Sequence, residues 1–275
     1  METRPIAYQV YSAREEAKSD LLSVLKQLKE MGYDGVEFAG FYDHSAKEVA
    51  AMLAETGLVA ISSHVQYKLM VEDMDAVIAY HKAIGCKYIA VPHLGPDERP
   101  GGCNFAKVIR NIYKFGKMCK ENGIQLMYHN HDFEFVTVSG MYGLDFLYDA
   151  VCPKLLKPEI DTCWVKYAGE DPAAYVRKYA GRVDVLHLKD YIGRKEGSAA
   201  PYGLIGEKEA EENGKIAFSF KPVGYGCQDI EGIVEAGLEA GVEWFVVEQD
   251  ASPDRPALES AKMSIDTLKK IGLKA

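Results

Sequence analysis

Residues 182–190 read RVDVLHLKD, a run in which apolar and polar side chains alternate. Alternation of this kind is typical of a β-strand, because successive side chains point to opposite faces of a sheet. Val183, Val185, His187 and Lys189 therefore share one face. The run predicts a strand that carries an imidazole and an ammonium group near its carboxyl end.

Similar short runs recur along the whole chain and alternate with helical patterns. The helices are predicted from apolar residues at helical spacing, from Ser45 with Glu48 as an N-terminal cap, and from Gly32 and Gly57 as stops. In chain order the eight predicted strands cover residues 6–11, 35–38, 58–65, 87–93, 124–131, 156–161, 182–190 and 243–250.

Strict alternation of eight strands with helices implies parallel strands joined by helical crossovers. An open, doubly wound sheet is the alternative, but it would normally use fewer strands and often carry a GxGxxG turn, which this sequence lacks. The prediction is one α/β domain over residues 1–275, folded as a (β/α)8 TIM barrel, and the length of 275 residues suits such a barrel.

One stretch, about residues 191–235, interrupts this rhythm between the seventh and eighth strands. It contains the polar run GEKEAEENGK and then FKPVGYGCQDIEGI. A long connection at this end of a barrel suits either a solvated insertion or a lid over the active face, and the sequence favours neither. Residues 230–241, IEGIVEAGLEAG, predict the helix before the last strand.

The composition argues against several kinds of protein. A formal net charge of −9 disfavours nucleic-acid binding, which usually needs a basic surface. No eighteen apolar residues run together, and METRPIAYQVYSAREE at the start has no apolar core of signal-peptide length, so a cytoplasmic protein without membrane contact is expected. The six cysteines form no CxxC pair and are expected to be reduced thiols.

Metal-type side chains fall at the carboxyl ends of the predicted strands, where the chemistry of such barrels is located. Asp161 ends the sixth strand, His187 lies near the end of the seventh and Glu248 lies in the eighth. Each alone could be a helix cap or a hydrogen-bonded structural residue, but three on successive strand ends favour one site. Two carboxylates and an imidazole suit one divalent ion, with manganese expected first and magnesium, cobalt or zinc as alternatives.

The fifth strand adds the segment YHNHDFEF, with His129, His131 and Glu134. Two histidines and a carboxylate so close together are hard to explain by packing alone. One of the three, with Glu134 as a candidate, is expected to be the fourth metal ligand. His129 or His131 is expected to act as a catalytic base near neutral pH, and the spacing does not decide between them.

Other polar residues are candidates for catalysis or substrate binding, although each could instead cap a loop or pack. Glu248 and Lys189 are expected to take part in catalysis, and Lys189 could instead simply pair with Asp161 or Glu248. Trp164 could supply an apolar wall for a sugar ring. The remaining candidates for substrate binding are Gln9, Glu37, His64 and His93.

The segments GYDGVEF, EIDTCW, GRVDVLHLKD, PVGYGCQDI and FVVEQD occur in an order that resembles the xylose isomerase-like TIM barrel superfamily. This sugar isomerase and epimerase group includes ketose 3-epimerases, inosose dehydratase and endonuclease IV. The resemblance covers essentially the whole chain and implies a divalent metal held at the ends of strands five to eight. Carried to this sequence, the implied ligands are Asp161, His187 and Glu248, while the strand-five position, typically Glu, holds His129.

Two departures from the family pattern bear on the reaction. Ketose 3-epimerases use a carboxylate from strand five and one from strand eight on opposite faces of the substrate, and His129 stands in place of the first. Epimerases and the nuclease also have a histidine three places after the strand-six aspartate, where this chain has Trp164. The missing histidine and the acidic charge argue against DNA repair, and the YHNH segment is closer to the inosose dehydratase side.

The expected function is metal-assisted removal of a proton next to a carbonyl of a keto-sugar or polyol, as in a sugar isomerase or epimerase. The alternative is a lyase that eliminates a β-substituent from a keto-inositol or a 3-keto-glycoside, because an enolate can expel such a group. Remote alternatives are a sugar-binding barrel without catalysis and a metal-dependent nuclease. A small carbohydrate is the expected partner, and association into a homo-oligomer remains open.

Overall fold

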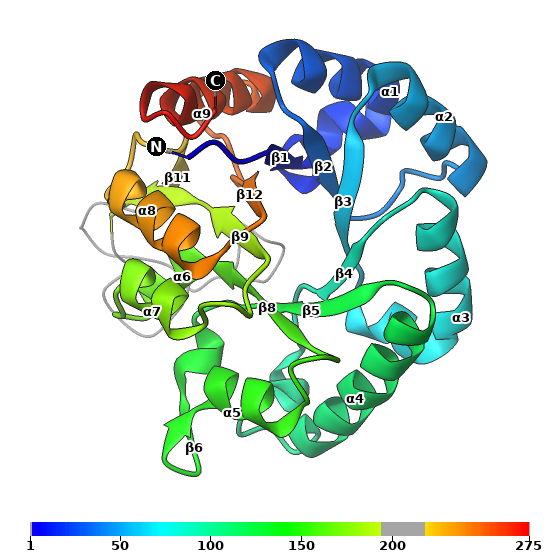
Figure 1. Cartoon of the computed structure of the whole chain (residues 1–275), viewed down its shortest axis with the longest axis vertical. Helices are drawn as coiled ribbons and strands as arrows, with labels where there is room; N and C mark the ends of the chain where they lie inside the picture. Colours follow the sequence, from blue (N-terminus) through cyan, green and yellow to red (C-terminus); the bar gives the residue numbers. More distant parts are fainter. Residues whose placement is uncertain (1, 194–217, 275) are drawn as a thin grey trace.

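The computed structural model describes residues 2–193 and 218–274. Eight parallel strands close into a barrel, and helices pack around its outside (Figure 1). The barrel strands are β1 (Ile6–Gln9), β2 (Gly35–Phe38), β3 (Val59–His64), β4 (Tyr88–Val91), β5 (Gln125–His129), β8 (Lys157–Asp161), β9 (Val185–Leu188) and β12 (Trp244–Val247).

The helices follow the strands in the order that the sequence predicts, with α5 and α6 in addition. They are α1 (Arg14–Met31), α2 (Ala46–Thr56), α3 (Tyr67–Ala83), α4 (Phe105–Glu121), α5 (Gly143–Ala150), α6 (Thr162–Tyr167), α7 (Pro172–Lys178), α8 (Ile230–Ala240) and α9 (Ala257–Lys270). A small hairpin, β6 (Thr137–Val138) with β7 (Met141–Tyr142), precedes α5.

Pairing of the first strand with the last closes the barrel. β1 pairs in parallel with β12, where Ile6 lies opposite Phe245, and with β2, where Ala7 lies opposite Gly35. The predicted TIM barrel is confirmed, and an open sheet is excluded. Several predicted strands extend past the observed ones, because residues such as Lys189 and Asp250 leave the sheet to form the mouth of the barrel.

Local signals for the helices are confirmed where they are strongest. Ser45 and Glu48 form a capping box at the start of α2, and Gly57 ends this helix with a φ of 65°. The helix predicted near residues 73–85 begins earlier, at Tyr67, but its helical course breaks at Asp73. There Oδ1 of Asp73 accepts a hydrogen bond from the N–H of Ala76 at 2.9 Å, so the predicted start is the cap of the second segment.

The interior of the barrel changes from apolar to polar along its axis. The apolar layer includes the inward side chains of four strands, Ala7, Met127, Val185 and Val246. Two residues further along each of the same strands, the next inward side chains are Gln9, His129, His187 and Glu248, all of them buried. The period-2 pattern of the sequence therefore brings polar side chains together at the carboxyl end of the barrel, where TIM barrels carry their active sites.

The predicted insertion at residues 191–235 is described only at its two ends. β10 (Asp190–Ile192) pairs antiparallel with β11 (Ser219–Lys221), and α8 follows as predicted. Residues 194–217 lie outside the described residues, so a lid and a solvated insertion both remain predictions.

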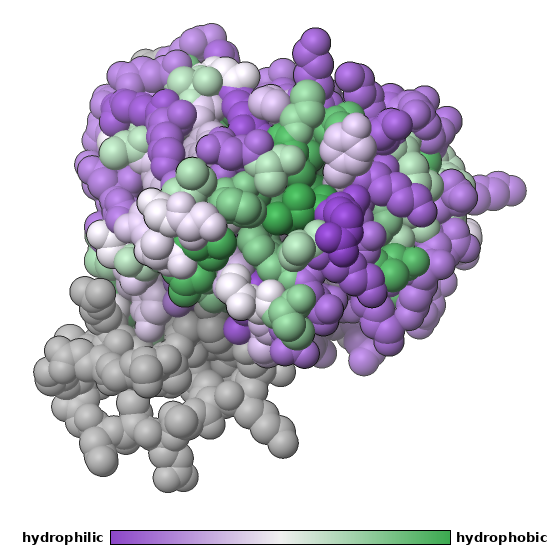
Figure 2. All heavy atoms as spheres, turned by 90° about the horizontal axis from the view of Figure 1, so that it is seen from below, coloured by the Kyte–Doolittle hydropathy of each residue, from purple (hydrophilic) through white to green (hydrophobic). Residues whose placement is uncertain are grey.

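Two expectations from composition concern the cysteines and the membrane. All six cysteines are free, and Cys86, Cys119 and Cys163 are buried. Among the residues described, no helix combines the length and apolar character needed to cross a membrane. The face seen from below is mostly hydrophilic, with apolar side chains gathered near its middle (Figure 2). Homo-oligomer formation stays a prediction.

Candidate metal centre and active site

Four buried side chains from adjacent strands converge at the mouth of the barrel. His129 ends β5, Asp161 ends β8, His187 lies in β9 and Glu248 follows β12. Parallel pairing sets Asp161 beside His187, so both side chains enter the barrel at the same height. One ligand atom from each of the four residues lies within 4.8 Å of those of the other three.

Asp161 both caps helix α6 and belongs to the group of converging donors. Its Oδ1 accepts hydrogen bonds from the N–H groups of Cys163 (2.8 Å) and Trp164 (3.3 Å), which caps α6. Its Oδ2 lies 3.6 Å from Nε2 of His129. The amide of Asn130 accepts from the N–H of Asp161 at 2.9 Å and donates to its carbonyl at 3.3 Å. The carboxylate is therefore held in place by the fold itself.

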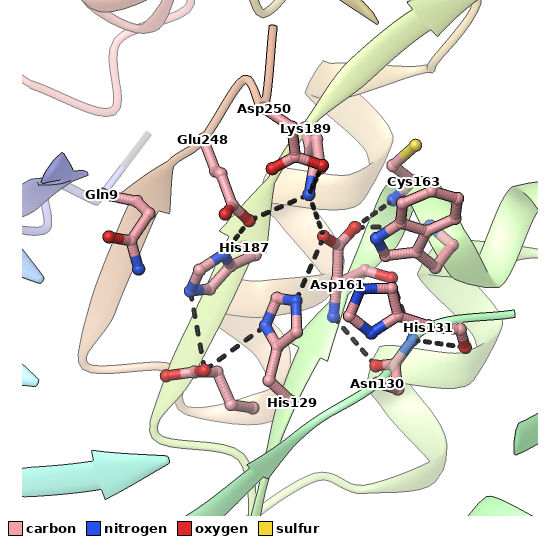
Figure 3. Close-up of polar contacts among 12 residues, drawn as sticks. Gln9, His129, Asn130, His131, Asp161, Cys163, His187, Lys189, Glu248 and Asp250 are labelled. Carbon is pink, nitrogen blue, oxygen red and sulfur yellow. Dashed lines mark hydrogen bonds and ion pairs between the residues drawn. The ribbon is translucent and has the colours of Figure 1, made fainter. Parts of the chain in front are cut away.

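One ammonium group lies among the carboxylates of the mouth (Figure 3). Lys189 is only 1% exposed, and its Nζ lies 3.2 Å from Asp161 Oδ2, 3.0 Å from Glu248 Oε2 and 2.8 Å from Asp250 Oδ2. Burial raises the pKa of Asp250 to about 7, against the opposing attraction of Lys189. Lys189 thus offsets negative charge that would be costly to bury without a partner.

The four converging donors fit a divalent metal. Carboxylate oxygens and imidazole nitrogens are ligands of manganese, cobalt and zinc in proteins. Asp161 Oδ2 makes an ion pair but no hydrogen bond, so it keeps lone pairs for a ligand. The ammonium of Lys189 beside Asp161 and Glu248 indicates that this place stabilises positive charge. His129, Asp161, His187 and Glu248 could therefore hold one ion, and their chemistry does not select the metal.

A second layer of buried polar side chains lies behind the two histidines. Glu37 Oε1 accepts a hydrogen bond from Nε2 of Gln9 at 2.7 Å and lies 2.8 Å from Nε2 of His187. Glu159 Oε2 lies 3.3 Å from Nδ1 of His129, and Nε2 of His64 approaches both carboxylates, at 3.0 Å and 2.7 Å. Each histidine of the donor group thus faces a buried carboxylate with its other nitrogen.

This arrangement sets each imidazole ring against a buried carboxylate at ion-pair distance, and neither Nδ1 of His129 nor Nε2 of His187 makes a hydrogen bond among the described residues. A carboxylate that accepts the N–H of a ligating histidine sets its tautomer and raises its basicity, as in carboxylate–histidine–metal groups. Burial opposes the ionisation of Glu37, but His64 and His187 outweigh it and hold the pKa of Glu37 well below its usual range. His64, His129, Glu159 and His187 also form a second possible donor group, which shares two histidines with the first.

His131 lies beside this centre in an aromatic surrounding. Its ring stacks on Phe133 and Trp164, with centroid distances of 5.3 Å and 5.1 Å, and meets His93 edge-on at 5.2 Å. Burial, reinforced by His93 and Lys189, lowers the pKa of His131 well below its usual value. The lowered pKa keeps this imidazole unprotonated near neutral pH, so it is available to accept a proton, although as a weaker base than an ordinary histidine.

A cavity of about 810 Å³ opens at the mouth of the barrel. Among the residues predicted from the sequence, five line it on its polar side: His129, His131, Lys189, Glu248 and His64. His93 lines it further out. Asp161 and His187 lie behind this surface, and so do three residues predicted to bind substrate, Gln9, Glu37 and Trp164.

The sequence of this chain matches a known family over most of its length. Residues 25–271 fit the family described as Xylose isomerase-like TIM barrel. The chain belongs to this family. The resemblance inferred from the motif order is thereby confirmed.

Similar proteins in the xylose isomerase-like family are enzymes. An inosose dehydratase of Geobacillus kaustophilus is 23% identical over 254 residues, which cover 84% of this chain and 80% of that protein. A sugar phosphate isomerase/epimerase from Parabacteroides distasonis has the same fold, with a TM-score of 0.77 at 23% identity over 99% of this chain and 100% of that chain. L-ribulose 3-epimerase gives a TM-score of 0.71 at 16% identity, over 98% of this chain and 94% of that chain. The chain is accordingly an enzyme in the broad isomerase, epimerase or lyase sense.

Glu134, a predicted metal ligand in this member of the xylose isomerase-like family, lies outside both donor groups. Its two carboxylate oxygens accept hydrogen bonds from the hydroxyl of Tyr128 (2.6 Å) and the N–H of His131 (2.8 Å). Burial raises the pKa of Glu134 to about 8. In this arrangement Glu134 contacts the segment that carries His131, and His129 is the residue of β5 that lies in both possible donor groups.

Several residues of the site have no strong signal in the sequence. Asp250 shares an alternating face with Glu248, which places it in reach of Lys189. Asn130 and Glu159 act through the backbone and the second layer, so only the three-dimensional arrangement identifies them. Asp190 accepts hydrogen bonds from the N–H groups of Gly224, Gly226 and Gln228, at 3.0, 2.9 and 3.1 Å, and so anchors the loop that contains the GYG motif.

Replacement of Lys189 by methionine should destabilise the protein when a chelator is present. The change leaves Asp161, Glu248 and Asp250 buried together without their cation, and the loss of one partner from a buried ion pair costs about 3–5 kcal/mol. The free energy of unfolding should fall by this amount in urea titrations with EDTA. Lys26→Met, which removes an exposed pair with Glu55, is the control and should leave the free energy of unfolding almost unchanged. Equal effects of the two substitutions would contradict the role given to Lys189.

Proposed function

We propose that this protein is a divalent-metal-dependent lyase that removes a proton next to the carbonyl of a keto-polyol and expels the β-hydroxyl group as water. The observation that carries the proposal is the position of His131, whose imidazole lines the cavity beside the four-donor group. Similarity to an inosose dehydratase over most of both chains supports the same class of reaction.

Epimerisation is the second candidate, favoured by Glu248, which also lines the cavity. An epimerase must remove a proton from one face of a carbon and return one to the other. In the ketose 3-epimerases that the sequence resembles, two carboxylates do this, and His129 stands at the position of one of them. His129 also faces Glu159 and Asp161 with its two nitrogens, so it is better placed to hold an ion than to move a proton.

His129, Asp161, His187 and Glu248 would hold the ion. A bound divalent ion would polarise the carbonyl and stabilise negative charge on its oxygen. His131 would accept the proton from the carbon next to the carbonyl, and the ammonium of Lys189 would favour the developing negative charge in a site shielded from water. The protonated His131 would then give its proton to the departing hydroxyl. One C–H bond and one C–O bond break, a C=C bond forms, and water leaves.

Metal content should separate the two candidates for the strand-five ligand. Purified protein should bind one manganese or other divalent ion per chain, and His129→Gln and Asp161→Asn should lose it. Asparagine keeps an oxygen that can cap α6, so Asp161→Asn should fold. Glu134→Gln should retain the ion, because Glu134 lies outside the donor groups. Elemental analysis measures the metal content of each variant, and chelator competition measures its affinity for the ion. Loss of the ion in Glu134→Gln with retention in His129→Gln would reverse the assignment.

Glu37→Gln should weaken metal binding although Glu37 is not a donor. The substitution removes the carboxylate that lies 2.8 Å from Nε2 of His187. Loss of such a partner of a ligating histidine typically lowers metal affinity by about 10–100-fold. The dissociation constant for Co2+ and its absorption spectrum would be compared with those of the wild type. Glu121→Gln, on the exposed end of α4, is the control and should change neither. An unchanged affinity in Glu37→Gln would remove Glu37 from the metal centre.

His131→Gln should abolish proton removal but keep the ion. Loss of a general base typically slows a reaction by about 10²–10⁴-fold. The metal-loaded protein would be incubated in D2O with an inosose and other keto-polyols, and deuterium at the carbon next to the carbonyl would be followed by NMR. His44→Gln is the control. A conjugated enone as product identifies the lyase, whereas a recovered epimer identifies the second candidate. Undiminished exchange in His131→Gln would rule out this base.

A further inference from the structure

The cavity reaches well beyond the residues that the proposed reaction uses. Its polar end contains His129, His131, Lys189, Glu248 and Asp250. Its other end lies over the segments that follow β2, β3 and β4. Its volume of about 810 Å³ lies toward the upper end of the range in which proteins bind drug-sized ligands, roughly 300–1,000 Å³, and a single polyol ring would occupy only part of it.

The far end of the cavity has an apolar, aromatic wall. Phe41 and Tyr80 stack on each other with a centroid distance of 4.2 Å and an interplanar angle of 27°. The hydroxyl of Tyr80 donates to the carbonyl of His44 at 2.7 Å, which holds the ring in place. Val65, Leu69 and Val77 complete the wall. These side chains offer a flat apolar group stacking and contact area. Gln66, Lys68, Glu72 and Asp73 also line the cavity along the start of α3.

The backbone is irregular at two places beside this wall, after Phe41 and at Asp73. Tyr42 and Asp43, directly after Phe41, both have positive φ values, of 51° and 63°, which non-glycine residues rarely adopt. The break of α3 at Asp73 separates the turn that carries Leu69 from the rest of the helix. Leu69 is 49% exposed although it is large and apolar, and it lines the cavity.

We propose that the substrate is a sugar that carries an aromatic group, and that Phe41, Leu69, Val77 and Tyr80 form the subsite for this group. The inference rests on the proposed function in placing the sugar ring at the polar end. The two ends belong to one continuous cavity, so a single ligand can fill both. Burial of the aromatic ring against Leu69 and Phe41 adds affinity in proportion to the apolar area that leaves water.

Binding of two glycosides that differ only in their apolar group tests the subsite. Phenyl β-D-glucopyranoside and methyl β-D-glucopyranoside would be titrated calorimetrically into the manganese-loaded protein. The phenyl glycoside should bind about 10-fold more tightly to the wild type. Leu69→Ser should reduce this preference roughly 5-fold, whereas Leu69→Met should keep it. The affinity for the methyl glycoside should stay the same in each variant.

Val71→Ser is a closely matched control. Val71 lies in the same turn of α3 and is 48% exposed, but it does not line the cavity, so its replacement should leave the preference unchanged. Equal binding of the two glycosides to the wild type, no binding of either at millimolar concentration, or equal effects of Leu69→Ser and Val71→Ser would overturn the subsite.

The titration tests the subsite and the deuterium exchange tests the proposed reaction, so a negative result in one does not decide the other. Exchange into a keto-polyol without preference for the phenyl glycoside would leave the proposed reaction and remove the subsite. A preference that depends on Leu69, with neither deuterium exchange nor an enone product from any keto-sugar, would keep the subsite and remove the proposed reaction.

Discussion

The contact of one buried ammonium with three carboxylates sets the geometry of the mouth of the barrel. Lys189 follows β9 and contacts Asp161 from β8 on one side and Glu248 and Asp250 after β12 on the other. The next residue, Asp190, points the other way and accepts three N–H groups of the loop at residues 224–228. A Cβ on Gly226 would lie 2.1 Å from Asp190 Oδ1, so this loop needs glycine there. Two adjacent residues thus fix the charge inside the mouth and the chain around it.

Behind this point, imidazole and carboxylate groups alternate in layers. Each of His129 and His187 lies between an outer carboxylate, Asp161 or Glu248, and an inner one, Glu159 or Glu37. Low local polarity strengthens such contacts and makes any missing partner costly, so the network is rigid when complete. Glu37 Oε2 and Glu159 Oε1 have no hydrogen-bond partner among the described residues. The desolvation of these buried carboxylates is costly, so the inner layer contributes little to stability by itself. Its carboxylates instead lie against ring nitrogens of His129 and His187.

The sequence was sufficient for the fold and for the convergence of the predicted donors that follow strand alternation. Asp161, His187 and Glu248 fall on inward faces at strand ends, and the period of two residues alone brings them together. The sequence left the fourth donor open between His129, His131 and Glu134. β5 ends at His129 and the chain then turns, so that the carboxylate of Glu134 accepts a hydrogen bond from the hydroxyl of Tyr128. Alternation likewise puts Gln9 and Glu37 inside the barrel, but it does not say that His187 would lie between Glu37 and the cavity. The distance of each side chain from the cavity depends on how the barrel closes, which no local sequence pattern encodes.

The two ends of the cavity come from different halves of the barrel, and this separates reaction from recognition. The polar end depends on β5, β8, β9 and β12, whose inward side chains are tied into one charge network. The apolar end depends on the segments after β2 and β3, which contribute Phe41 and Leu69 without a contact to that network. Residues on such connecting segments can change without disturbing the barrel core. On the proposed function, substitution in these segments would therefore alter which substituent of a sugar the cavity accepts, while the groups proposed to hold an ion and move a proton would stay as they are.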